Sequence, residues 1–192
     1  MAKSALVTGS TDRIALVRSA LEEAGLEVFA ADDPGKVAET CWASQEGFDA
    51  YVQLPTNIPT NATSLVGQIG ILIEKGILGR FREAELVLAY LAPGAHVVLV
   101  AGNLPADLSA PDDHEARMAL LRVLSHALRA ERAPAGGRVS VLAAGAAPEE
   151  IACAALGEQP GKQAVPDFAA LWPDMPYDEW RLRVMDLSVL ES

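Results

Sequence analysis

Short apolar runs alternate with amphipathic helical patterns along most of the chain, and this alternation limits the possible folds more than any other feature. The apolar runs are bounded by Gly, Pro or Asp, which is typical of strands buried within a sheet. We expect strands over residues 4–8, 26–31, 48–54, 96–101 and 138–143. We expect helices over residues 11–24, 36–45, 61–91, 109–130 and 148–156. Strands that alternate with helices imply a parallel sheet with helices on both faces.

The length of 192 residues suits one domain with a full core and is short for two. The alternation ends near residue 156, so one domain is expected over residues 1–156. Residues 157–192 carry four prolines and two tryptophans, and we expect this tail to pack on the domain or on a partner subunit. The helical region over residues 61–91 contains four glycines, which predict a bend or a close helix contact.

The charge and the cysteines exclude several classes of partner. Acidic residues outnumber basic ones by 26 to 15, which gives a net charge of −11. Such a chain repels phosphate backbones and anionic lipids, so we expect no nucleic acid and no membrane as partner. The sequence begins with a strand and no apolar leader, and Cys41 and Cys153 lack metal or redox spacing. We therefore expect a cytoplasmic protein with two buried cysteines; a disulfide or a reactive thiol is the alternative.

Several local patterns follow one another in a familiar order. Residues 7–15 read Val-Thr-Gly-Ser-Thr-Asp-Arg-Ile-Ala, and the helix after them ends in Ala24-Gly25. Residues 91–98 lead into the fourth strand as Leu-Ala-Pro-Gly-Ala-His-Val-Val, and residues 148–152 open the last helix as Pro-Glu-Glu-Ile-Ala. This order resembles the short-chain dehydrogenase/reductase (SDR) family, which begins with a strand, a T-G-x-x-x-G-x-G turn and a helix. The resemblance implies an α/β, Rossmann-like doubly wound parallel sheet of about five strands, with helices on both faces.

The resemblance places a dinucleotide cofactor at the turn after the first strand. The candidate cofactor-binding residues are Gly9, Ser10, Thr11, Arg13 and Asp32. In the family, three glycines shape this turn, and the second lets the backbone approach the pyrophosphate. Here Arg13 stands where the second glycine belongs, and Ala15 stands where the third belongs. The Cβ of Arg13 should block the usual pyrophosphate position, although its guanidinium could hold a phosphate in another pose.

Asp32 ends the second strand, where an acid would hold the adenosine ribose in NAD-binding members of the family. The alternative interpretation is a turn acid that caps Pro34-Gly35, and we favour it because two of the three glycines are absent. We therefore expect no cofactor, or NAD(P) if one binds.

The catalytic positions of the family carry other residue types in this chain. The resemblance aligns the family's Asn with Gly76, its Ser with Gly102, and its Tyr and Lys with Asp113 and Arg117. An aspartate with an ordinary pKa of about 3.9 cannot exchange a proton near neutrality as that tyrosine does, and a neighbouring arginine lowers its pKa further. Arginine also stays charged, so it cannot relay a proton. Hydride transfer of the family type is not expected, and Asp113 is interpreted as a first-turn acid that complements the helix dipole.

Other chemistry has less support. The three histidines lack metal-ligand spacing, so no metal site is expected. A cofactor-independent acid–base site around Asp112, Asp113 and His114 stays open. The region between the second and third strands is too short for the family's third strand. Without that strand, the resemblance implies the sheet order 2-1-3-4-5. That order is also flavodoxin-like, so a flavin or phosphate site at the first turn is a further alternative.

Two helical regions, residues 62–91 and 112–130, carry apolar residues around most of their circumference. A helix that only covers a sheet needs one apolar stripe, so a wider apolar surface suggests a second partner. Burial against the chain's own tail is the alternative. The family pairs its subunits through the corresponding helices in a four-helix bundle.

The leading hypothesis is a non-catalytic SDR-like protein that acts as a structural or regulatory subunit. It would form a homo-oligomer or pair with an active SDR homologue through the two helical regions. The alternatives are a divergent NAD(P)-dependent oxidoreductase and a nucleotide-binding sensor.

Overall fold

Five parallel strands form the sheet that the apolar runs predict. They are β1 Ser4–Thr8, β2 Glu27–Ala31, β3 Phe48–Gln53, β4 Leu91–Val100 and β5 Arg138–Leu142. Their order is β2-β1-β3-β4-β5, and every neighbouring pair is parallel, which confirms the predicted topology. The computed structural model describes residues 3–9, 12–44, 47–58, 61–102 and 111–158, but not the side chains of residues 65 and 111–119. Almost all of the predicted tail therefore lies outside the described residues.

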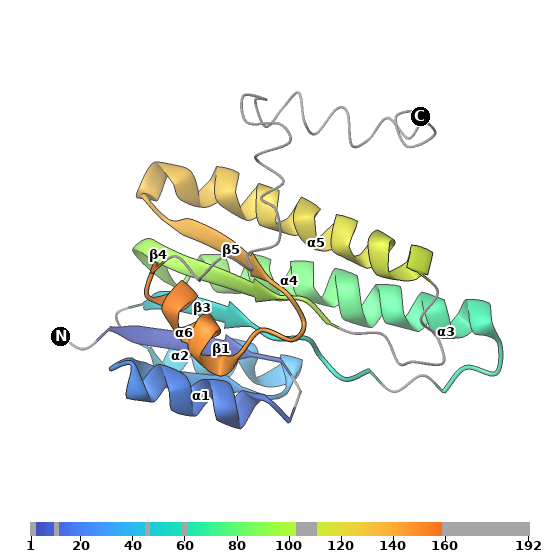
Figure 1. Cartoon of the computed structure of the whole chain (residues 1–192), viewed down its shortest axis with the longest axis horizontal. Coiled ribbons are helices and arrows are strands. Elements are labelled where there is room, and N and C mark those ends of the chain that lie inside the picture. The colour runs from blue at the N-terminus through green and yellow to red at the C-terminus, as the bar shows by residue number, and fades with distance from the viewer. Residues whose placement is uncertain (1–2, 10–11, 45–46, 59–60, 103–110, 159–192) are drawn as a thin grey trace.

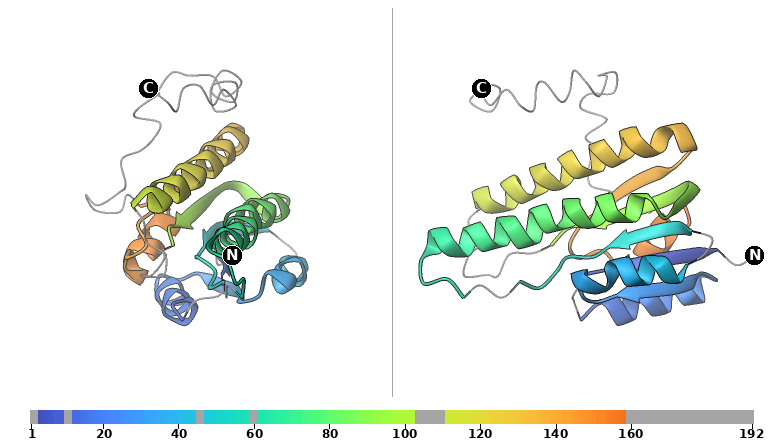
Figure 2. Two further views of the ribbon diagram at one scale, coloured as in Figure 1. Left: turned by 90° about the vertical axis from the view of Figure 1, so that its right-hand side faces the viewer. Right: turned by 180° about the vertical axis from the view of Figure 1, so that it is seen from behind.

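Helices cover both faces of the sheet, as predicted (Figure 1). They are α1 Ile14–Glu23, α2 Val37–Ala43, α3 Leu65–Ile71, α4 Gly79–Leu88, α5 Pro111–Arg132 and α6 Pro148–Ala155. Two 3-10 turns, η1 Pro34–Lys36 and η4 Ala133–Ala135, precede α2 and follow α5. Helices α1 and α6 pack together on one face, and α2, α4 and α5 cover the other (Figure 2).

The core has two halves because successive strand side chains point to opposite faces of the sheet. Val7, Val52 and Val98 are buried against α1 and α6. Leu6 and Leu99 are buried against the helices of the other face. This double burial explains why the strands read as continuous apolar runs and not as alternating ones.

The long helical region after β3 contains a π-helical segment, η2 Leu72–Leu78, between α3 and α4. The four glycines of this region had predicted a bend or a close contact. A Cβ at Gly67 would lie 2.9 Å from the Cβ of Ala62, and one at Gly76 would lie 2.9 Å from Cδ1 of Ile58. At these two positions glycine lets the segment that follows β3 pack directly against the helix.

Two further details differ from the sequence analysis. Strand β4 begins at Leu91 and not at residue 96, because a register shift in its pairing with β3 accommodates the Pro93-Gly94 interruption. Helix α5 buries Leu121, Leu124 and Leu128 against the sheet. Part of the wide apolar surface that had suggested a second partner for residues 112–130 therefore covers the sheet.

The cysteines form no disulfide, since both are free. Cys41 is buried, as expected, whereas Cys153 is only half-buried. Within the described residues, no helix combines the length and the apolar character that a membrane span requires.

Candidate functional site at the carboxyl edge of the sheet

The carboxyl ends of β1 and β3 mark the point where the chain leaves the sheet in opposite directions. From β1 it runs through α1 to β2, and from β3 it runs through α3 and α4 to β4. Such a switch point is where open parallel sheets bind ligands. Here the two loops touch, because a Cβ on Gly9 would lie 2.6 Å from the carbonyl oxygen of Leu54. Gly9 also has a φ of +121°, which favours glycine.

Arg13 closes this edge from the α1 side. Its guanidinium donates to the carbonyl oxygens of Ala144 and Ala146, which follow β5. Charge-assisted bonds of this kind are among the stronger hydrogen bonds in proteins. Two of the guanidinium nitrogens are therefore engaged by backbone carbonyls at the place where the resemblance puts a pyrophosphate.

Arg80 of α4 caps two more strand ends. Its Nη1 donates to the carbonyl oxygen of Val100 at 2.9 Å, and its Nη2 donates to the carbonyl oxygen of Gln53 at 3.2 Å. Its Nε donates to the side-chain oxygen of Gln53 at 2.9 Å. Burial lowers the pKa of Arg80 to about 10, because removal from water disfavours the charged form. The arginine still carries its charge at neutral pH.

Beside Arg80, a polar cluster built on Glu83 links α4 to β1 and β3. Oε1 of Glu83 accepts hydrogen bonds from the Tyr51 hydroxyl at 2.7 Å, from Nε2 of Gln53 at 3.0 Å and from the Thr8 hydroxyl. Burial raises the pKa of Tyr51 well above its usual value, and the Glu83 carboxylate adds to that shift. The Tyr51 hydroxyl therefore stays protonated and donates its hydrogen bond to Glu83.

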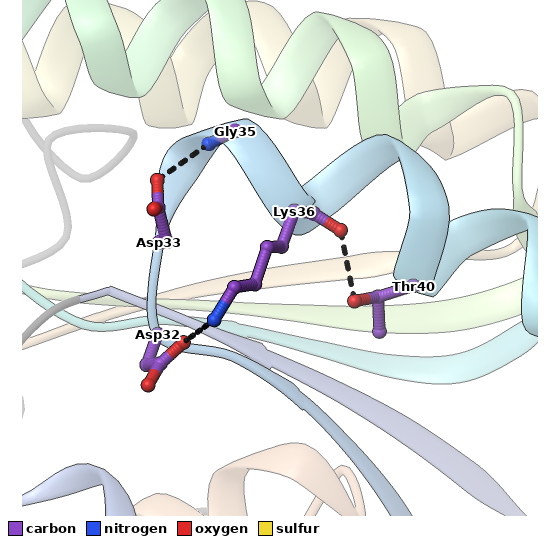
Figure 3. Close-up of polar contacts among 5 residues, drawn as sticks. All are labelled: Asp32, Asp33, Gly35, Lys36 and Thr40. Carbon is purple, nitrogen blue, oxygen red and sulfur yellow. Dashed lines mark hydrogen bonds and ion pairs between the residues drawn. The ribbon is translucent and has the colours of Figure 1, made fainter.

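Asp32 is exposed directly after β2, and Figure 3 shows its contact with Lys36. Its carboxylate pairs with Nζ of Lys36 at 3.3 Å, and both side chains are exposed. The turn at Pro34-Gly35 is capped by Asp33, which accepts from the Gly35 N–H at 2.8 Å. The interpretation of Asp32 as the capping acid is therefore wrong by one residue.

The structure brings only some of the other predicted site residues to this edge of the sheet. Gly102 follows β4 beside the switch point, and a Cβ there would lie 3.0 Å from the Cβ of Pro55. Gly76 lies in the π-helical segment, against Ile58. Asp113 and Arg117 lie in the first turns of α5, but their side chains are outside the described residues, as are Ser10 and Thr11 altogether. Among the described residues, no group of three His, Cys, Asp or Glu side chains could hold a metal ion.

The sequence analysis missed the cluster of Tyr51, Gln53, Arg80 and Glu83. One signal was present, because Tyr51 and Gln53 are polar positions two apart in a buried strand and so share one face. Arg80 and Glu83 are three apart in a helix and also share a face. Nothing in the sequence indicates that these two pairs meet, since Tyr51 and Glu83 are 32 residues apart.

The same architecture occurs in solved structures, two of which are described as dehydrogenases. The protein lin1944 from Listeria innocua has 16% identity and a TM-score of 0.60, over 83% of this chain and 97% of that one. A small-chain dehydrogenase has 21% identity and a TM-score of 0.59, over 82% and 89% of the two chains. A short-chain dehydrogenase/reductase from Serratia marcescens has 15% identity and a TM-score of 0.50, over 72% of each chain. No protein-family model matches the sequence, and no curated protein matches it either.

These likenesses show that the chain has the Rossmann-like fold of short-chain dehydrogenases/reductases. The resemblance read from the sequence is thereby confirmed for the fold. The 192-residue chain is short, which fits a shortened version of that architecture.

Proposed function

We propose that this chain is a non-catalytic protein with the SDR fold that acts as a structural or regulatory subunit of an oligomer. The bonds from Arg13 to the carbonyls of Ala144 and Ala146 carry the proposal. In this fold a dinucleotide needs free backbone and a close approach at the first turn. In this chain that position holds a side chain whose two terminal nitrogens already donate to backbone carbonyls of the protein itself.

The remaining carboxyl edge supports the same conclusion. Arg80 binds the carbonyls at the ends of β3 and β4, where a catalytic site of this fold would be assembled. The aligned catalytic positions hold Gly76, Gly102, Asp113 and Arg117 in place of Asn, Ser, Tyr and Lys. The internal bonds stabilise an edge that enzymes of this fold leave open for ligands.

Assembly is supported by apolar side chains on the outer surface of the long helix. Val66 of α3 is 82% exposed, and Ile73 and Leu78 of η2 are 43% and 44% exposed. Helix α3 also extends past the carboxyl ends of the strands and runs beside α5 (Figures 1 and 2). Exposed apolar residues that line one helix are typical of an interface. We propose that a second copy of the chain, or an active homologue of the same fold, packs on α3, η2 and α5.

The test measures mass in solution by size-exclusion chromatography with light scattering. The expected result is a dimer for the unchanged chain and a monomer for the double variant Val66→Asp, Ile73→Asp. Leu16→Asp is the matched control, because Leu16 of α1 is 60% exposed on the opposite side of the sheet and should leave the dimer intact. If the chain is instead monomeric, its addition should change the activity of an SDR-fold enzyme from the same organism. A monomer that changes no such activity contradicts the proposal.

A further inference from the structure

A groove of about 580 Å³ opens between α2 and the helix formed by η2 and α4. That volume lies within the range of small-molecule sites, about 300–1,000 Å³. Its walls come from the start of α2, from the segment after β3, and from one side of η2 and α4. The lining residues include Pro34, Val37, Thr56, Asn57, Ile58, Glu74, Lys75, Gly79, Arg80, Arg82, Glu83 and Leu86.

One wall of the groove is apolar. Val37 is buried at the start of α2, Pro34 is exposed beside it, and Leu86 faces them from α4 with 39% of its surface exposed. An exposed leucine next to a buried valine leaves apolar surface in contact with water. The body of a ligand that covered this wall would gain about 25 cal/mol for each Å² removed from water.

Cations of η2 and α4 also line the groove. Among the described residues, Lys75 and Arg82 form no hydrogen bond and no ion pair. Arg80 uses three of its five N–H groups on Gln53 and Val100, so two have no partner among the described residues. These groups can hold an anionic head by charge-assisted hydrogen bonds.

The acids limit how much negative charge the groove accepts. Glu74 lies next to Lys75 on the same lining, and the whole chain carries a net charge of −11. Both repel a polyanion more strongly than a monoanion. Glu83 adds a second carboxylate to the lining, and its Oε1 accepts three hydrogen bonds from neutral groups of the protein.

The backbone of this wall is unusual. Glu74 and Lys75 belong to η2, a π-helical segment of seven residues. π-Helical turns are rare, are mostly single turns, and occur often at functional sites. This rare local conformation therefore lies at the wall of a cavity, which supports a role for that cavity.

We infer that the groove binds a small amphipathic monoanion, namely an organic carboxylate. Lys75 and Arg82 hold the carboxylate, with the spare N–H groups of Arg80 beneath it. The apolar body packs on Pro34, Val37 and Leu86. This site requires one copy of the chain only, so it does not depend on the proposed assembly.

The test compares three probes of equal length: decanoate, decanol and decylamine, each below its micellar concentration. Titration calorimetry and thermal shift should show saturable binding of decanoate and at least tenfold weaker binding of the alcohol and the amine, since each tenfold step is about 1.4 kcal/mol. The double variant Lys75→Gln, Arg82→Gln should weaken decanoate binding by roughly tenfold or more. Arg18→Gln on α1 is the matched control and should leave it unchanged.

A second variant tests the apolar wall. Leu86→Gln should weaken decanoate binding more than hexanoate binding, because only the longer chain covers that wall. Circular dichroism checks that each variant folds, and all the substituted side chains are exposed. The proposal is overturned if decanoate does not bind saturably, if the Lys75, Arg82 double variant binds it equally well, or if adenosine monophosphate binds more tightly than decanoate.

Discussion

Replacement of Arg13 by alanine should destabilise the protein well beyond the average cost of losing a half-exposed arginine. The guanidinium donates to the carbonyls of Ala144 and Ala146, and so ties the start of α1 to the loop after β5. A hydrogen bond from a charged group contributes about 1.5–3 kcal/mol where it is buried. Arg13 is half-buried, so solvent screening reduces two such bonds to a total of about 2 kcal/mol.

A loss of that size is easy to measure. For a domain of about 150–250 residues, each 1 kcal/mol shifts Tm by about 2–4 °C. Arg13→Ala should therefore lower Tm by about 4–8 °C in a thermal melt. Urea denaturation should also show a lower free energy of unfolding for this variant. The Tm of Arg13→Lys should lie between those of Arg13→Ala and the unchanged protein. A single ammonium keeps the charge but cannot reproduce the two-pronged geometry of a guanidinium.

Arg18 of the same helix supplies the matched control. It forms an exposed ion pair with Glu22 at 2.7 Å, and such pairs contribute about 0.3–0.5 kcal/mol. Arg18→Ala should change Tm by no more than about 2 °C. If Arg13→Ala costs no more than Arg18→Ala, the two carbonyl bonds do not hold the carboxyl edge closed and the reasoning fails.

Three further predictions concern the core around this edge and the opposite end of the sheet. Gly157→Ala should cost at least about 1 kcal/mol more than Gly25→Ala in urea denaturation. Both glycines have positive φ, but only a Cβ at position 157 would clash with the His96 ring, and equal costs would refute that contact. Burial lowers the pKa of His96, so the folded state favours its neutral form. Stability should fall as pH drops below about 6.5, and His96→Asn should flatten that part of the stability curve. Tyr51→Phe should cost about 1–2 kcal/mol by calorimetry, since it removes a donor from Glu83, and a neutral effect would show that the cluster contributes nothing.

The sheet could be predicted from the sequence because its determinants are local. Each buried strand is a short apolar run. Parallel strands that are buried on both faces are apolar at successive positions, so the run itself marks the strand. The order of the strands came from the family resemblance, once the short segment between β2 and β3 had removed the family's third strand. The first half of β4 was not predicted, because Pro93-Gly94 interrupts the run and only its pairing with β3 keeps those residues in the sheet.

The site was harder to predict because its contacts join distant segments. Arg13 is 131 residues from Ala144, and no local pattern indicates that they meet. Arg13 in place of a glycine predicts a changed first turn, but the partners of its guanidinium depend on where the loop after β5 lies. The π-helical segment was likewise not predictable, since a few residues of i→i+5 bonding leave no distinct periodicity in a glycine-containing helix.

The central claim is that the carboxyl edge is closed by the protein's own side chains and takes no dinucleotide. The most direct measurement is the thermal shift of the purified chain with NAD⁺, NADH, NADP⁺ and NADPH. A cofactor present at 100 times its Kd would add about 2.7 kcal/mol, which is about 5–10 °C for a domain of this size. The account predicts no shift with any of the four. A clear shift with one of them would show that the turn at Gly9 and Arg13 opens for a pyrophosphate, and it would contradict the assignment as a non-catalytic subunit.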